Sequence, residues 1–154
     1  MLRSLCFLVA ATAAFADNDF QVDLSQSKYV LGTSKLTFME AYVRCKHDGL
    51  TLAMERTSEE TNELNAVIKS YSTLQSQPFF LGGFKITNPL FIEPQWLWYE
   101  TFKPFNYTNW HPLTSNTSSC LVKQCNLGYA CKWRTESCNS TYIYYICQAL
   151  DSSD

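Results

Sequence analysis

The chain has 154 residues and a mass of 17.7 kDa, and 46% of its residues are hydrophobic, 15% aromatic and 17% charged. This composition supports one compact domain with an apolar core, and it excludes both disorder and a second domain of ordinary size. The formal net charge is -2 and the pI is about 5.7, so the excess of positive charge typical of nucleic-acid binders is absent. Nucleic acid and other polyanions are therefore not expected as partners.

Residues 1–16 are typical of a secretory signal peptide. Arg3 supplies the charged start, an apolar run extends from Leu5 to Ala14, and the small residues Ala14 and Ala16 precede a cleavage expected before Asp17. The apolar run is too short to span a bilayer, and no later run approaches about 20 consecutive apolar residues. We therefore expect a secreted, extracellular protein with no membrane-spanning segment.

Cleavage of the signal would remove Cys6, one of seven cysteines, and leave six in an oxidising compartment. An even number in a secreted chain favours three disulfides over free thiols or a zinc site. Three Asn-X-Ser/Thr sequences, which begin at Asn106, Asn116 and Asn139, predict exposed N-glycosylation sites. The six cysteines are Cys45, Cys120, Cys125, Cys131, Cys138 and Cys147.

The front half of the chain predicts a short strand and two helices. Residues 17–27 show no regular pattern and are expected to be a lead-in segment, and the β-branched and aromatic residues of 28–31 predict a strand. Thr37 and Glu40 form a capping box at the start of the first helix, and Gly49 supplies the left-handed residue that ends it. Apolar residues at helical spacing follow this box at Phe38, Ala41, Tyr42 and Cys45.

A second helix follows in the front half, and strands make up the second half. Thr57 and Glu60 form a second capping box, and the buried stripe of a second helix follows at Leu64, Val67, Ile68 and Tyr71. Helices followed by strands predict an α+β domain. Aromatic and β-branched runs separated by Pro and Gly then predict strands at 79–81, 96–99, 120–123 and 142–147.

A series of short motifs extends from the first predicted helix to the last strand. It consists of Glu40-Ala-Tyr-Val-Arg-Cys45, Gly49-Leu-Thr-Leu-Ala53, Phe80-Leu-Gly-Gly83, Trp96-Leu-Trp98, Asn109-Trp110, Cys120, Lys132-Trp133, Cys138 and Tyr145-Ile-Cys147. In order and spacing the motifs resemble the C-type lectin-like domain over residues 28–149, in the small, secreted, single-domain form common in insects, and residues 150–154 form a polar tail. The resemblance implies two helices with two small, mainly antiparallel sheets, held together by disulfides.

The resemblance also implies a pairing for four of the cysteines. Cys125 and Cys131 remain, and Gly128 in the short segment between them can adopt a positive φ, so a bridge there would close a hairpin. The alternative is that one of these two cysteines pairs with another chain. The pairs that the resemblance implies are Cys45–Cys147 and Cys120–Cys138.

Sugar binding in the resembled family usually depends on a calcium ion. The ion is held by a Glu-Pro-Asn or Gln-Pro-Asp triplet after the Asn-Trp motif and by Asn and Asp after the later Trp, and calcium needs about six to eight oxygen ligands. Here the interval from Thr101 to Thr135 contains no Asp or Glu, and Arg134-Thr135 stands in place of Asn-Asp. Glu93-Pro94-Gln95 lies before Trp110 and is expected to form a turn. We therefore expect no metal ion and no cofactor.

The aromatic residues admit two interpretations. The flat faces of Trp and Tyr can stack on sugars, but buried packing is their ordinary use and the tryptophans fall where the resembled family fills its core. We therefore expect Trp96, Trp98, Trp110 and Trp133 in the core. Tyrosines are the better candidates for exposure, namely Tyr107, Tyr129, Tyr142 and Tyr144.

Basic residues would surround one hairpin of the predicted sheet, at Lys123, Lys132 and Arg134. They are interpreted as the charged protection of a solvated sheet edge, and the alternative is a docking surface for an acidic protein or a sulfated glycan. His111 lies in a short neutral segment next to Pro112 and could donate a hydrogen bond to a ligand.

No serine, cysteine or acid is arranged with a histidine in a signature of nucleophilic catalysis, so we do not expect an enzyme. The leading hypothesis is a recognition module that binds carbohydrate without calcium, through side chains around residues 105–119. The alternatives are recognition of a protein, such as an immune, coagulation or reproductive-fluid partner, and a structural subunit that dimerises with itself or a related chain. The candidate ligand-binding residues are Tyr107, His111, Thr114, Asn116, Lys132 and Arg134.

Overall fold

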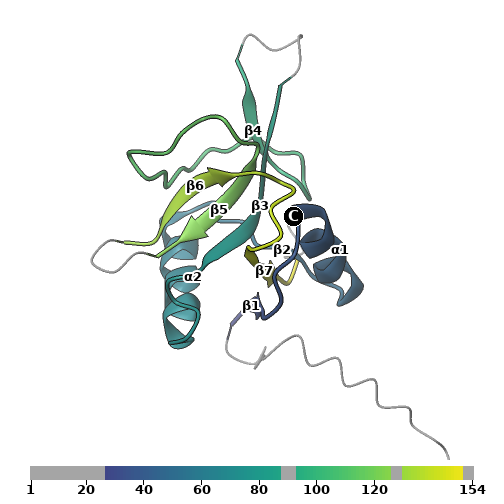
Figure 1. Cartoon of the computed structure of the whole chain (residues 1–154), viewed down its shortest axis with the longest axis vertical. Helices are drawn as coiled ribbons and strands as arrows, with labels where there is room; N and C mark the ends of the chain where they lie inside the picture. Colours follow the sequence, from purple (N-terminus) through teal and green to yellow (C-terminus); the bar gives the residue numbers. More distant parts are fainter. Residues whose placement is uncertain (1–26, 88–92, 126–129, 151–154) are drawn as a thin grey trace, which may run out of the picture.

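The computed structural model describes residues 27–87, 93–125 and 130–150 (Figure 1). The expected signal peptide, most of the lead-in segment, Gly128, Tyr129 and nearly all of the tail lie outside these residues. Two helices and seven strands make up the described part of the chain. They are β1 (Tyr29–Gly32), α1 (Phe38–His47), β2 (Thr51–Leu52), α2 (Ser58–Ser70), β3 (Pro78–Ile86), β4 (Gln95–Trp98), β5 (Cys120–Gln124), β6 (Lys132–Glu136) and β7 (Tyr144–Gln148).

The first helix begins and ends where the sequence predicts. Thr37 Oγ1 accepts a hydrogen bond from the Glu40 amide at 3.3 Å, and Glu40 Oε2 accepts one from the Thr37 amide at 2.9 Å, which completes the capping box. Gly49 has a φ of 74° just beyond the helix. Both signals are therefore confirmed, because the cap and the left-handed glycine satisfy the exposed backbone groups at the two ends.

Only half of the second capping box forms. Thr57 caps α2 by accepting a hydrogen bond from the Glu60 amide at 3.1 Å. The Glu60 carboxylate instead accepts hydrogen bonds from the Arg56 amide at 2.5 Å, from Arg56 Nη2 at 2.8 Å and from Lys28 Nζ at 3.1 Å. Hydrogen bonds between charged groups are stronger than a hydrogen bond from a neutral amide. The Glu60 carboxylate therefore binds Arg56 and Lys28 and does not bind the Thr57 amide.

The strands form one connected sheet. The order is β1-β7-β3-β5-β6, with β2 on β7 and β4 on β3. The sequence predicts two small sheets, but Phe79 and Phe80 of β3 pair in parallel with Tyr144 and Tyr145 of β7 and join the strands into one. The other pairings between the named strands are antiparallel, as expected. Two strands lie outside the predicted runs. β2 has two residues and carries no readable alternation, and β6 consists mostly of polar and charged residues.

Each face of the sheet is covered by one helix. Neighbouring residues of a strand point to opposite faces, and Phe79 accordingly packs in the same cluster as Leu64 and Ile68 of α2. Phe80, its neighbour, packs with Phe38 of α1. Figure 1 shows the two helices well apart with the sheet between them. The core is therefore two apolar layers, one under each helix.

Three disulfides link these elements. The first joins α1 to β7 across a sequence separation of 102 residues, for which the chain-entropy model gives about 4–5 kcal/mol of stabilisation. The second joins β5 to the segment after β6, and the third closes the connection between β5 and β6. The pairs are Cys45–Cys147, Cys120–Cys138 and Cys125–Cys131, so the two cysteines left over by the resemblance pair with each other.

Candidate functional site

A fully buried ion pair lies behind the edge of the sheet. Lys123 Nζ donates to both carboxylate oxygens of Glu55 at 2.8 Å, and both side chains are 0% exposed. Burial lowers the pKa of Lys123, and the attraction of Glu55 opposes that effect. Lys123 is therefore not part of an exposed basic patch, and that part of the sequence interpretation is wrong. The alternation of β5 turns this residue toward the core.

Glu55 also holds the residues that support the neighbouring loop. Its carboxylate accepts hydrogen bonds from Trp133 Nε1 at 2.7 Å and from Asn109 Nδ2 at 3.0 Å. Thr61 Oγ1 of α2 donates to the same group at 2.6 Å. A buried carboxylate is stable only when its oxygens are satisfied by donors and a counter-charge. Glu55 therefore fixes Asn109 and Trp133 relative to the core.

The loop of residues 109–116 lies along the outer edge of β6. The Trp133 amide donates to the Asn109 carbonyl at 2.8 Å, and the His111 amide donates to the Trp133 carbonyl at 2.8 Å. Farther along, Thr135 Oγ1 donates to the Ser115 carbonyl at 2.7 Å. Because β6 is the last strand in the sheet order, this loop covers an edge whose backbone groups would otherwise be unpaired.

Two adjoining hollows lie at this edge. The Lys132 hollow has a volume of about 400 Å³ and the Trp110 hollow about 370 Å³, within the usual range of ligand pockets. The first is lined by Leu113, Gln124, Lys132 and Arg134, and the second by Trp96, Trp110, Pro112 and Asn116. Both are bordered by His111, Thr114, Ser115 and Thr135.

The two cations of the Lys132 hollow have different surroundings. Lys132 Nζ donates to Asn109 Oδ1 at 2.7 Å, and no carboxylate of the described residues lies within ion-pair distance of it. Arg134 donates from Nε to Gln124 Oε1 at 2.9 Å and from Nη1 to Glu136 Oε2 at 2.7 Å. Glu136 therefore compensates the charge of Arg134, whereas no carboxylate of the described residues compensates that of Lys132.

Glu136 is committed to its own neighbours. Burial alone would raise the pKa of its carboxyl group, but hydrogen bonds from Arg134, the Ser137 amide and Ser140 outweigh burial and lower the pKa. Ser140 Oγ and the Ser137 amide both donate to Oε1 at 3.0 Å, while Arg134 occupies Oε2. This carboxylate is therefore ionised at neutral pH and already saturated with donors.

The Trp110 hollow contains two half-buried aromatic faces. Trp96 and Trp110 lie with their ring centroids 5.0 Å apart. Trp98 and Trp133 are 2% and 0% exposed, so the core prediction is confirmed for these two and wrong for Trp96 and Trp110, which only border the core. Trp96, which pairs with Lys85, lies nearer than Trp98 to the tip of the β3–β4 hairpin. This hairpin extends away from the helices in Figure 1.

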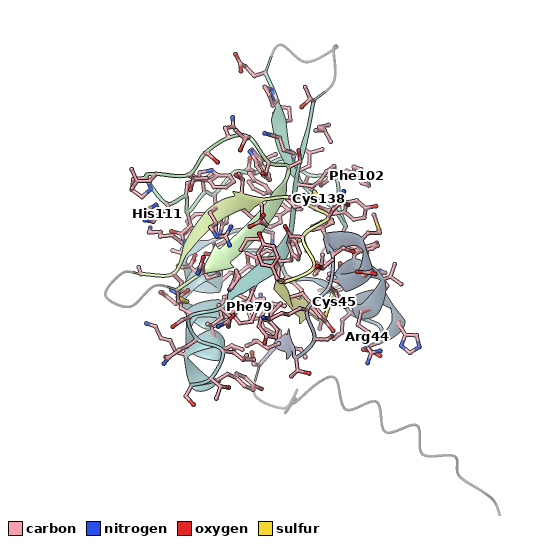
Figure 2. The ribbon with its side chains drawn as sticks, in the orientation of Figure 1. Arg44, Cys45, Phe79, Phe102, His111 and Cys138 are labelled. Atoms are coloured by element: carbon pink, nitrogen blue, oxygen red, sulfur yellow. A yellow bond between two sulfur atoms is a disulfide. The ribbon has the colours of Figure 1, made fainter. Side chains whose placement is uncertain are left out.

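The structure brings together five of the six predicted ligand-binding residues. Figure 2 shows His111 on the loop beside β6, at the side of the molecule away from α1. His111 Nδ1 accepts a hydrogen bond from the Leu113 amide at 3.2 Å. The five residues that line the hollows are His111, Thr114, Asn116, Lys132 and Arg134.

Tyr107 is placed elsewhere. Its hydroxyl lies 2.8 Å from Thr61 Oγ1 of α2, and its ring packs edge-on against Trp133. It lines neither hollow. The structure therefore assigns Tyr107 to the contact between α2 and the core, and separates it from the other five residues.

Comparison with known proteins identifies the fold family. The model of the Lectin C-type domain matches residues 34–149. The chain belongs to the C-type lectin domain family. No curated protein sequence matches the chain.

Solved structures of C-type lectin domains share the fold at low sequence identity. The domain of murine dendritic cell inhibitory receptor 2, solved in complex with N-glycan, has a TM-score of 0.63 and 18% identity, and the match covers 87% of this chain and 98% of that one. Human lithostathine gives 0.64 and 17%, with 87% and 98% covered. A Ca²⁺-dependent type II antifreeze protein in its Ca²⁺-free form gives 0.59 and 22%, with 84% and 96% covered. At these identities the likeness establishes the fold alone.

In this C-type lectin domain, the positions that the family resemblance gives to the calcium ligands carry no carboxylate, and Arg134-Thr135 stands in place of Asn-Asp. No group of three or more His, Cys, Asp or Glu side chains is close enough to hold a metal ion within the part of the chain that the structure describes. Lys132 and Arg134 face the hollow where anionic oxygens would be needed, and the nearby carboxylate of Glu136 is bound to Arg134. A divalent cation here would meet repulsion in place of ligands.

The sequence reasoning missed several residues of the site. Glu55 was not singled out, although it directly follows the apolar run Leu52-Ala53-Met54, where a carboxylate predicts a buried partner. Leu113, Ser115, Gln124 and Thr135 were also missed, because their side chains are ordinary and only the pairing of the loop with β6 brings them together.

Within the described residues, neither helix is long and apolar enough to cross a membrane.

Proposed function

We propose that this C-type lectin domain is a secreted recognition module that binds carbohydrate without calcium, in the two hollows at the β6 edge. The observation that carries the proposal is the pair of adjoining hollows, which combine hydroxyl groups with aromatic faces and have no carboxylate among the described residues that line them. C-type lectin domains are in general recognition modules without enzymatic activity. One structural relative was solved with an N-glycan, which supports carbohydrate as the ligand class.

The chemistry of the hollows suits a sugar ring. Thr114, Ser115 and Thr135 border both hollows with hydroxyl groups. The hydroxyls of Thr114 and Thr135 donate to the carbonyls of Trp133 and Ser115, so their oxygens remain as acceptors for the hydroxyl groups of a sugar. Trp96 and Trp110 present apolar rings, against which the C–H face of a sugar can pack. Polar groups that fix orientation beside an apolar surface are the usual composition of a ligand site.

Secretion and glycosylation are part of the proposal. Three disulfides suit an oxidising compartment such as the secretory pathway. The asparagines of all three predicted glycosylation sequences are exposed, as an acceptor must be. They are Asn106, Asn116 and Asn139.

Thermal unfolding with and without calcium tests the calcium-independent part. A bound ion would stabilise the folded state by RT ln(1 + [L]/Kd), so an ion with a sub-millimolar Kd must raise Tm at millimolar calcium. We expect the same Tm in calcium and in EDTA. A rise of several degrees in calcium would mean that the protein holds an ion and that the proposal is wrong.

A glycan panel probed in EDTA tests the carbohydrate part. Trp96→Leu removes an aromatic face of the Trp110 hollow and should weaken binding about tenfold, because a stacked ring contributes about 1–3 kcal/mol when its area is buried. Phe102→Leu is the matched control, since Phe102 is 66% exposed and lines neither hollow. Equal losses in both variants would place the binding surface elsewhere.

One observation favours protein recognition as the second candidate. Leu113 lies on the same loop and is 86% exposed, and the buried core of a protein interface is more apolar than the rest of the surface. Absence of binding across the glycan panel, together with capture of one defined extracellular protein that Leu113→Ser abolishes, would favour this function. Dimerisation with itself or a related chain stays a prediction, and a concentration-dependent mass in solution would support it.

A further inference from the structure

We propose that the Lys132 hollow takes a single anionic group, a sulfate ester or a carboxylate, carried by the bound sugar. This inference rests on the proposed carbohydrate binding and specifies its ligand class. It is carried by the juxtaposition, in one hollow of about 400 Å³, of an uncompensated lysine with a histidine and an arginine.

Lys132 is the first reason. Its ammonium group is half-buried, and Asn109 Oδ1 at 2.7 Å is the one acceptor that it contacts among the described residues. An amide oxygen offers a dipole but no counter-charge. No Asp or Glu occurs between Thr101 and Thr135, so the segments that form the loop and most of β6 supply no carboxylate to this lysine. A ligand anion would complete its surroundings.

The neighbouring side chains supply further donors. Arg134 uses Nε and Nη1 for Gln124 and Glu136, which leaves Nη2 without a partner within the described part of the chain. His111 Nδ1 accepts a hydrogen bond from the Leu113 amide, so the N–H donor of the ring is Nε2. Lysine, arginine and histidine donors in one hollow match the several acceptor oxygens of a sulfate or carboxylate group.

The charge distribution limits the ligand to one anionic group. Glu136 compensates the charge of Arg134 at 2.7 Å, so among the described residues that line this hollow Lys132 alone carries an uncompensated charge. The whole chain has a net charge of -2, which repels a long polyanion. A sugar with one anionic group can pair with Lys132, and because it carries a single charge the net negative charge of the chain repels it less than a polyanion.

The experiment compares neutral glycans with their counterparts that carry one sulfate or one sialic acid, on a panel printed in matched pairs and probed in EDTA. We expect the charged member of a pair to bind at least tenfold more tightly than the neutral member, and we expect 500 mM NaCl to reduce this preference. Preference for sulfate or for sialic acid identifies the anion, and either supports the inference.

Three variants assign the effect to Lys132. Lys132→Gln should abolish the preference, and Lys132→Arg should retain at least part of it, because the charge is kept. Lys69→Gln is the matched control, since Lys69 is exposed on α2, outside both hollows, and its loss changes the net charge equally. The Tm of each variant confirms that it is folded.

Two outcomes overturn the inference and are distinguishable. If neutral and charged members of a pair bind equally, or if Lys132→Gln keeps the preference, the Lys132 hollow does not bind an anionic group. The proposed carbohydrate binding is unaffected by this outcome. If the folded protein binds no glycan on the panel, the proposed function itself fails and the inference fails with it.

Discussion

The ion pair between Glu55 and Lys123 shows how a single residue can act on the candidate site without touching a ligand. Glu55 is fully buried and accepts hydrogen bonds from Lys123, Trp133 and Asn109. The Trp133 amide in turn donates to the Asn109 carbonyl, and the Trp133 carbonyl accepts from the amide of the loop residue His111. The position of the recognition loop therefore depends on a carboxylate in the core.

Lys123→Met is expected to destabilise the fold by about 3–5 kcal/mol, because it leaves the charge of Glu55 buried without its cation. Urea unfolding at pH 7 measures this loss. The double variant Lys123→Met with Glu55→Gln should lose less than the sum of the two single variants, since the glutamine carries no charge. Lys103→Met, at an exposed position, is the control and should change stability by less than about 0.5 kcal/mol. Strictly additive losses would show that the pair is not coupled.

At the residue scale, the sequence predicts what depends on near neighbours. The cap of Thr37 and the left-handed Gly49 were predictable, because the partners of each lie within a few residues along the chain. Lys123 was placed on the surface because charge usually lies there. Its partner Glu55 is 68 residues away, and no local pattern reveals such a pair.

At the scale of elements, Glu100 connects α1 to β2. Its carboxylate accepts hydrogen bonds from Tyr42 at 3.0 Å, from Lys46 at 2.9 Å and from Thr51 at 2.9 Å. Burial alone would raise the pKa of Glu100, but hydrogen bonds from Lys46, Thr51 and Tyr42 outweigh it and lower the pKa below its ordinary value of 4.5. The folded state therefore favours the ionised carboxylate.

Glu100→Gln should cost about 1–3 kcal/mol of stability at pH 7, because hydrogen bonds to a charged group are lost. A carboxylate whose pKa is lowered by folding stabilises the protein above its unfolded pKa of about 4.5, and that contribution disappears as the pH falls through the folded pKa. The difference between the wild type and the variant should therefore shrink below pH 4.5. Urea unfolding at pH 7 and pH 3 measures it, with the exposed Glu93→Gln as the control. A difference that stays constant with pH would assign the loss to packing.

The elements themselves were mostly predictable, and their connection was not. Both helices lie at the expected stripes, and five strands overlap the expected runs, whereas β2 and β6 lie outside them. The joining of the strands into one sheet depends on the parallel pairing of Phe79 and Phe80 with Tyr144 and Tyr145, about 65 residues along the chain. The loop beside β6 was expected to contain the site, but its hydrogen bonds to Trp133 and Thr135 could not be read from composition.

At the scale of the whole molecule, a glycan could compete with the ligand. Asn116 begins one of the predicted glycosylation sequences and lines the Trp110 hollow. Lys85 Nζ donates to the Asn116 carbonyl at 2.6 Å and to Asn116 Oδ1 at 3.2 Å, which holds the side chain beside the hollow. An N-linked glycan on Asn116 would therefore occupy space next to the site.

Asn116→Gln in the secreted glycoprotein should bind ligand glycans more tightly than the wild type, by several-fold, because the covalent glycan no longer crowds the hollow. Asn139→Gln is the matched control, since Asn139 is exposed in a glycosylation sequence but lines neither hollow. Both variants are compared on the same glycan panel, after mass spectrometry has confirmed occupancy of each site in the wild type.

Ser118→Ala separates crowding from a direct effect of the Asn116 amide, because it removes the glycosylation sequence and keeps the asparagine. If crowding is the cause, Ser118→Ala and Asn116→Gln should bind equally tightly, and both should bind more tightly than the wild type. If Asn116→Gln instead binds more weakly than Ser118→Ala, the amide itself contacts the ligand. In that case the contact of Lys85 with Asn116 prepares a binding group, and the Trp110 hollow stays open only while Asn116 carries no glycan.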